Sequence, residues 1–276
     1  MTLRIVSADF ETDCFDGPYV YGDKESGYRV QTDITGGVLT GARNGHILEA
    51  SFRLLDRDMN YLDDVSVLIR HPKSVWNDMN ESVREFHSKC HEGKEYSFQE
   101  RYFKFVYGTD TFVDQTEYPG IEIHEDENGN EEWVAESVEC LEKAIIQMLK
   151  NDNPDLELYD MRSEDQLFLL GKSVRFDRNF MDAQMPIVSR MLNHQILDPS
   201  VLKLAGRLWG PAYEIQPRRS THDAYEDCLA AEKDMEVLMT FYKSLPKVKY
   251  QKDAYRAVRN PLYRTWLWIK RHLIGV

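Results

Sequence analysis

The chain has 276 residues, of which 42% are hydrophobic and 29% are charged, so its composition is that of a folded globular protein and excludes a disordered or fibrous one. Its formal net charge is −13, a sign that by itself disfavours binding to nucleic-acid phosphates through Lys and Arg. No stretch approaches the roughly 20 apolar residues of a membrane span and the start lacks signal-peptide features, so we expect a cytoplasmic protein without membrane contact. The four cysteines show no Cys-x-x-Cys spacing, so we expect reduced thiols and no zinc ribbon.

Residues 3–10 are predicted to form a short buried strand that delivers two acidic side chains at its end. Asp9 and Glu11 lie two positions apart, so in an extended backbone both project to the same face. Hard divalent ions such as Mg²⁺ prefer carboxylate oxygens, and two ions about 3.5 to 4 Å apart can hold both the attacking and the leaving oxygen of a phosphodiester. An Asp-x-Glu pair also recurs by chance as solvated surface, so the pair alone leaves both interpretations open.

Two insertions are predicted along the next part of the chain. Residues 12–45 are rich in Gly, Asp and Tyr with weak periodicity, which indicates an irregular segment or a small hairpin. Residues 47–55 and 61–69 are β-rich and flank a flexible DRDMN, so they predict an antiparallel hairpin, and residues 79–90 are predicted to be helical. The second insertion, residues 93–135, contains a strand-like FKFVYG and a hairpin centred on an Asn-Gly turn.

The second half of the chain alternates helices with strands. A helical pattern covers residues 136–150, a buried strand follows at 165–171, and one helix is predicted from Arg175 to Leu192. The pattern ends with a brief strand at ILD, a helix begun by Asp198 and Pro199, and a long helix over residues 223–243. Three strands followed by this alternation predict one mixed-sheet α/β domain.

Two of these helical segments carry further candidate residues. Asp177 lies in the first turn of a predicted helix, where the helix dipole alone would favour an acid. His222 and Asp227 are five apart, about 140° around a straight helix, so His222 is expected on a loop just before the helix, where it can accept a proton from water. The alternative is a surface His222 paired with Glu226 at i+4.

Taken together, the three segments resemble a known family. The order DFE, GKSVRFDRNFM and HDAYEDCLAAE resembles the motifs of the DEDDh 3′–5′ exonuclease superfamily, and the chain is most similar to its oligoribonuclease family. The similarity continues through ILDPSVLKLAGRLW, ILEASFRLLDRDMNYL and MNESVREFHSKC, about two thirds of the chain. It implies an RNase H-like fold, a mixed five-stranded sheet flanked by helices, here bearing the two insertions and a basic C-terminal extension.

The resemblance also implies roles for individual residues. Asp9, Glu11 and Asp227 would hold one Mg²⁺ or Mn²⁺ ion, Asp9 would reach a second ion, and Asp177 would support that second ion through water. His222 would act as general base, which completes the catalytic set. Substrate contacts are implied for Phe10, Phe15, Ser173 and Ser200.

The sequence departs from the family at several positions. Phe15 best matches a leucine that wedges against a base, and an aromatic ring would stack there equally well. Ser173 and Ser200 match serines that cap a 5′ phosphate, but Gln195 stands where the family has an arginine, which weakens the case for a dinucleotide-only substrate. Compact family members also lack the insertions, which could lengthen a substrate channel or build an interface.

The C-terminal extension, residues 244–276, is predicted to differ from the domain formed by residues 1–243. From Lys243 onward there are nine Lys or Arg against Asp253 alone, so this end is about +8 and the remainder about −21. Its interleaved Tyr and Trp suit single-stranded nucleic acid, whereas its apolar residues favour docking on the domain or a homodimer. The acidic run IEIHEDENGNEEWVAESVE is either a solvated face or a site for a basic protein partner.

These observations lead to one principal hypothesis and two alternatives. The principal hypothesis is a metal-dependent 3′–5′ exonuclease that hydrolyses short or single-stranded RNA to nucleoside 5′-monophosphates, with two metal ions and a histidine base. The first alternative is the same chemistry on DNA. The second is an exonuclease-like acidic module that occupies the nucleic-acid site of a basic protein.

Overall fold

The computed structural model describes residues 3–14, 20–21, 29–30, 41–79, 81–90, 94–108, 112–159, 165–201, 203–204 and 223–244. The chain divides into two compact units, Met1–Leu238 and Met239–Val276. Of the second unit only the end of one helix, up to residue 244, is described. Within the described residues no helix is long and apolar enough to cross a membrane.

An eight-stranded mixed sheet, ordered β10-β9-β1-β4-β5-β8-β7-β6, forms the centre of the first unit. Its strands are β1 (Leu3–Thr12), β4 (Ile47–Asp56), β5 (Tyr61–Ile69), β6 (Phe112–Gln115), β7 (Ile121–Glu125), β8 (Glu131–Ala135), β9 (Gln166–Leu170) and β10 (Leu192–Leu197). β1 runs antiparallel to β4 and parallel to β9. The predicted mixed α/β sheet and the β4–β5 hairpin are confirmed.

The sheet has eight strands and not the predicted five, because the second insertion adds three of its own. β8 pairs in parallel with β5 through Leu68 and Ile69, and β7 and β6 continue the sheet antiparallel. The Asn-Gly turn lies between β7 and β8, where Gly129 has a φ of 81°, a conformation that glycine adopts without steric cost. In the first insertion, β2 (Val20–Tyr21) and β3 (Arg29–Val30) form a small antiparallel pair.

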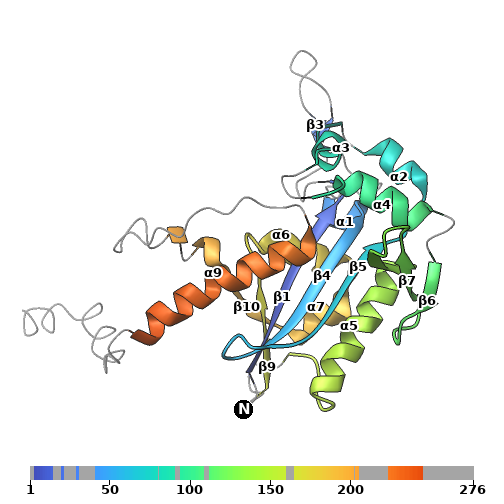
Figure 1. Ribbon diagram of the computed structural model, residues 1–276. Coiled ribbons are helices and arrows are strands. Elements are labelled where there is room, and N and C mark those ends of the chain that lie inside the picture. The colour runs from blue at the N-terminus through green and yellow to red at the C-terminus, as the bar shows by residue number, and fades with distance from the viewer. Residues whose placement is uncertain are drawn as a thin grey trace, which may run out of the picture. The chain divides into compact units, whose positions relative to one another are not determined.

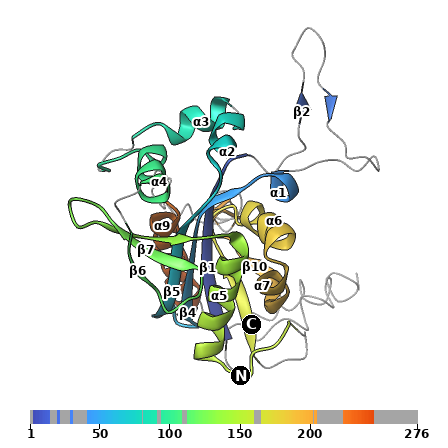
Figure 2. The ribbon, with the colours of Figure 1, turned by 90° about the vertical axis from the view of Figure 1, so that its right-hand side faces the viewer.

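Helices cover both faces of the sheet (Figures 1 and 2). The helices in the described residues are α1 (Gly41–Asn44), α2 (Lys73–Asp78), α3 (Glu81–His87), α4 (Phe98–Tyr107), α5 (Val138–Asp152), α6 (Arg175–Gln184), α7 (Pro186–Met191) and α9 (Ala224–Ser244). α5, α6 and α7 pack on one face over fully buried residues such as Phe52, Ile145 and Phe180. α9 crosses the other face over β1 and β4, and its Cys228 thiol donates to the carbonyl of Ser51.

Two predicted elements are wrong. The strand-like FKFVYG belongs to helix α4, because Ser97 and Glu100 form a capping box and the helical spacing buries Phe98, Tyr102 and Phe105. The helix expected from Arg175 to Leu192 is broken at Met185, whose backbone before Pro186 is not helical, and Leu192 begins β10.

Other expectations lie partly or wholly outside the described residues. Most of the insertion at 12–45 is among them, as is the extension 244–276 apart from Ser244. The division of the chain into a domain of residues 1–243 and an extension therefore stays a prediction. The helices expected at 136–150 and 223–243 are confirmed as α5 and α9.

Candidate active site

Three acidic side chains, two from the start of the chain and one more than 200 residues later, meet beside the C-terminal end of β1. Asp9 and Glu11 come from β1, and Asp227 comes from the first turn of α9. One carboxylate oxygen from each lies within 4.8 Å of the others. Asp227 is buried while its neighbour Glu226 is exposed, so the geometry brings Asp227 and not Glu226 to this acid cluster (Asp9, Glu11 and Asp227).

Asp177 lies on the same side, held by the strand that carries the cluster. It is in the first turn of α6 and is 4% exposed. Its Oδ1 accepts a hydrogen bond of 3.1 Å from the backbone N–H of Phe10, the residue between Asp9 and Glu11. Asp177 therefore does more than complement a helix dipole, because it ties α6 to β1 at the acid cluster.

A cavity of about 340 Å³ opens over these four acids. Besides them, its lining includes Phe10, Phe86, Phe176, His87, Lys172 and Ser173. Phe86 is 38% exposed, so an aromatic face is accessible at the rim. Acidic groups at the base with aromatic rings beside them suit a ligand that combines a polar, metal-binding part with flat bases.

The acids are held under electrostatic strain. Burial raises the pKa of Asp9 well above its usual value, and the carboxylates of Asp177, Glu11 and Asp227 raise it further. Burial likewise raises the pKa of Glu11, with Glu49 the largest neighbouring contributor, and burial raises that of Asp177. Clustered carboxylates of this kind stay ionised at low cost only when a cation joins them.

The donor set fits a hard divalent cation. All three groups of the acid cluster offer oxygen, which Mg²⁺ and Mn²⁺ prefer over nitrogen and sulfur. Among the described lining residues, Lys172 is the only Lys or Arg, and its Nζ lies 3.6 Å from Asp234 on α9. The cluster can therefore hold a divalent ion.

Part of the chain is similar in sequence to proteins of known name. The chain is similar to oligoribonucleases. It is 33% identical to oligoribonuclease of Bordetella pertussis over 86 residues, 31% of this chain and 40% of that protein. It is also 33% identical over 78 residues to mitochondrial oligoribonucleases of Mus musculus and Homo sapiens, 28% of this chain and 31% of each of those proteins. The matches thus span less than half the length of each relative, and no protein-family model matches the chain.

Some of the predicted substrate residues belong to the described part of the chain, and others do not. Phe10 and Ser173 line the cavity. Ser200 lies beside Ser173, because Oδ1 of Asp198 accepts from the backbone N–H groups of both, at 2.8 and 3.3 Å. Gln195 is exposed on β10. Phe15 and His222 lie outside the described residues, and their roles stay predictions.

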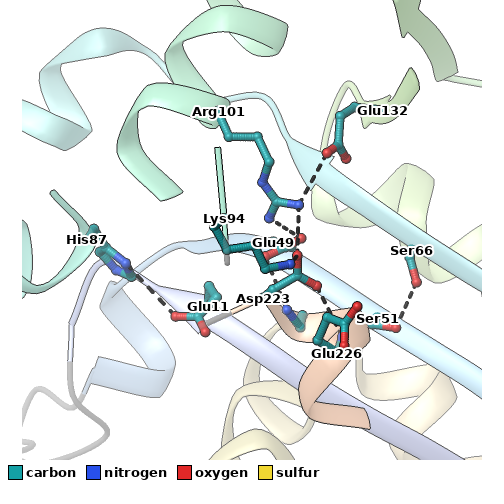
Figure 3. A network of polar contacts seen from close by, with 11 residues as sticks. Glu11, Glu49, Ser51, Ser66, His87, Lys94, Arg101, Glu132, Asp223 and Glu226 are labelled. Atoms are coloured by element: carbon teal, nitrogen blue, oxygen red, sulfur yellow. Dashed lines mark hydrogen bonds and ion pairs between the residues drawn. The ribbon is translucent and has the colours of Figure 1, made fainter. Parts of the chain in front are cut away.

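Two further residues touch the acids and were not predicted. His87 on α3 donates from Nε2 to the carbonyl of Thr12 at 2.8 Å, while its buried Nδ1 lies 3.9 Å from Glu11 and has no hydrogen-bond partner (Figure 3). Burial lowers the pKa of His87. Glu49 on β4 lies directly opposite Glu11 in the sheet, and burial raises its pKa to about 7. Only the register of β1 against β4 reveals that Glu49 is a neighbour of Glu11.

Proposed function

We propose that this protein is a metal-dependent 3′–5′ exonuclease of the DEDDh type that acts on short or single-stranded RNA. The observation that carries the proposal is the meeting of Asp9, Glu11 and Asp227 at the base of a cavity with aromatic walls. The similarity to oligoribonucleases supports RNA as the substrate and an RNase H-like arrangement of the sheet.

Each side chain then has a defined task. Asp9, Glu11 and Asp227 hold one Mg²⁺ or Mn²⁺, and Asp9 and Asp177 serve a second. The ions supply charge neutralisation and Lewis-acid polarisation of the phosphodiester. His222 accepts the proton of the attacking water, and the products are nucleoside 5′-monophosphates released from the 3′ end.

The rest of the cavity selects a single strand. Phe86 and Phe176 offer ring faces on which unpaired bases stack, a contact worth about 1 to 3 kcal/mol per base. Ser173, with the neighbouring Ser200, and the Lys172 ammonium group bind phosphate oxygens. A duplex keeps its bases stacked inside the helix, so it gains little from these contacts.

The acidic-module alternative receives less support from the structure. Several acids of the run between Ile121 and Glu139 pair within the chain: Glu122 with Arg70, Asp126 and Glu127 with Lys104, and Glu132 with Arg101. Carboxylates already paired in this way offer less charge to a basic partner.

The test is a time course with Mg²⁺ or Mn²⁺ on 5′-labelled RNAs of two to twenty residues, next to matched DNAs. We expect RNA ladders that shorten one nucleotide at a time from the 3′ end, and no shortening with the Asp9→Asn variant. If the matched DNAs are cleaved faster than the RNAs, the result favours the alternative of a DNA-directed exonuclease. Oligonucleotides of both kinds left intact by the parent protein would defeat it.

A further inference from the structure

A partly buried arginine of the second insertion joins three separate segments of the fold. Arg101 on α4 is 17% exposed, and its guanidinium contacts three carboxylates (Figure 3). These are Glu49 on β4 at 2.5 Å, Glu132 on β8 at 3.2 Å, and Asp223 just before α9 at 3.3 Å. A guanidinium holds its five N–H donors in a rigid plane and can fix several carboxylates at set angles, whereas an ammonium group is a compact charge on a flexible stem.

Two of these three carboxylates also hold the first turn of α9. Oε2 of Glu49 accepts from the backbone N–H of Ala224 at 3.3 Å, and Oδ1 of Asp223 accepts from that of Glu226 at 3.1 Å. Lys94 adds a second cation to Asp223 at 2.9 Å. Carboxylates at these positions satisfy the N–H groups that a helix start leaves without partners, so Arg101 acts on α9 through them.

The position of this turn sets the position of the third acid of the cluster. The N–H of Asp227 donates to the carbonyl of Asp223 at 2.9 Å, so Asp227 follows Asp223 by one helical turn. On the strand side, Glu49 lies opposite Glu11 in the β1–β4 register. The network of Arg101, Lys94, Glu49, Glu132 and Asp223 thus touches the acid cluster from both the sheet and α9.

We propose that Arg101 is a positioning residue of the acid cluster, which through Glu49 and Asp223 holds the first turn of α9 so that Asp227 meets Asp9 and Glu11. Its effect on hydrolysis rests on the proposed function, whereas its effect on the cluster does not. The second insertion then forms part of the construction of the active site, because α4 supplies the arginine and β8 supplies Glu132.

The test measures Mn²⁺ binding to the full chain by titration calorimetry, without substrate. We expect Arg101→Lys to weaken binding by about 10-fold or more, the loss typical of residues that orient metal ligands. Lys keeps the charge and the apolar stem, so the variant is designed to fold. Glu49→Gln nearly preserves the size of the side chain but removes the carboxylate that pairs with Arg101. This variant should also bind Mn²⁺ more weakly than the parent protein.

The matched control is Arg70→Gln. Arg70, directly after β5, pairs with Glu122 on β7 at 2.9 Å, so this Arg–Glu pair also joins the second insertion to the rest of the sheet but includes neither Glu49 nor Asp223. It should leave the Mn²⁺ dissociation constant within about twofold, because a partly exposed ion pair outside the network contributes little.

The outcomes separate this inference from the proposed function. An unchanged Mn²⁺ dissociation constant in Arg101→Lys and Glu49→Gln, even with a lowered Tm, would mean a purely structural role and overturn the inference. A parent protein without saturable Mn²⁺ binding would overturn it too. If both variants bind Mn²⁺ more weakly while the parent protein cleaves no oligonucleotide, the inference is upheld and only the proposed function is defeated.

Discussion

Asp227 and Glu226 are adjacent acids at the start of α9, and their opposite burial gives a direct test of the acid cluster. Asp227 faces Asp9 and Glu11, whereas Glu226 is exposed. We expect Asp227→Asn to lower the rate of RNA cleavage by more than about 100-fold, since even changes behind a metal ligand cost about 10- to 100-fold. Glu226→Gln is the control and should cleave at nearly the parent rate. The reverse pattern would assign the ligand to Glu226.

The raised pKa values of the cavity acids predict how the metal-free protein responds to pH. A carboxyl group whose pKa is higher in the folded state binds more protons when folded, so stability falls as pH rises from the unfolded pKa to the folded one. Asp9, Glu11 and Asp177 share this direction, and for Glu49 the range runs from 4.5 to about 7. In EDTA, the Tm measured by calorimetry should therefore decrease from about pH 5 to pH 7.

The substitution Asp177→Asn tests the cost of clustering these buried carboxylates. Asparagine keeps an oxygen that can accept the N–H of Phe10 but removes one buried charge. We expect the metal-free variant to melt higher than the parent at pH 7, by about 2 to 4 °C for each kcal/mol of repulsion removed. Saturating Mn²⁺ should narrow or reverse this difference in Tm, because the ion stabilises the parent protein more than the variant. A lower Tm in EDTA would show that the Asp177 carboxylate stabilises the fold.

The residues that could be predicted from sequence are those whose partners are near in the chain or whose motif is local. Asp9 and Glu11 follow from the two-residue repeat of a strand. Glu49, Arg101 and His87 could not be found this way, because each reaches the site from an element whose place depends on long-range pairing. Nothing in the residues around Arg101 indicates that Glu49, more than fifty positions earlier, is its partner.

At the scale of elements, α4 and α5, which each begin with a serine N-cap, offer a matched comparison. Ser97 caps α4 and Ser137 caps α5, each by accepting a backbone N–H. Ser97→Ala and Ser137→Ala should each lower the free energy of unfolding by about 1 kcal/mol, the usual value of such a cap. Only Ser97→Ala should also weaken Mn²⁺ binding, because α4 carries Arg101. Equal Mn²⁺ affinities in both variants would argue that α4 tolerates fraying without moving Arg101.

Each wrong element has its own physical cause. FKFVYG contains β-favouring residues in alternation, yet the capping box and the burial of Phe98, Tyr102 and Phe105 beside Trp76 favour a helix, since tertiary packing outweighs local preference. The break at Pro186 was marked in the sequence by the proline itself, but the apolar pattern continues across it. The sheet was predicted too small because β8 pairs with β5 through only two residues, which leaves no clear pattern.

At the scale of the whole molecule, the uneven distribution of charge decides how a polyanionic substrate can approach. The chain before Lys243 carries about −21 and the rest about +8. Phosphates are repelled by the first and attracted by the second, and single strands bind surfaces that combine cations with aromatic rings. We therefore predict, as the alternative to docking, that the extension, residues 244–276, supplies cations for this substrate that the acidic remainder of the chain lacks.

Removal of residues 245–276 tests this role. We expect the KM for twenty-residue RNAs to rise and its dependence on salt to become shallower, because fewer counterions are released when fewer Lys and Arg contact phosphates. Dinucleotides serve as the control, since they are too short to span both the cavity and a second site, and their KM should stay near the parent value. If the KM and its salt dependence are unchanged while the protein passes from dimer to monomer, the apolar residues of the extension build an interface instead, as the docking interpretation of its sequence predicts.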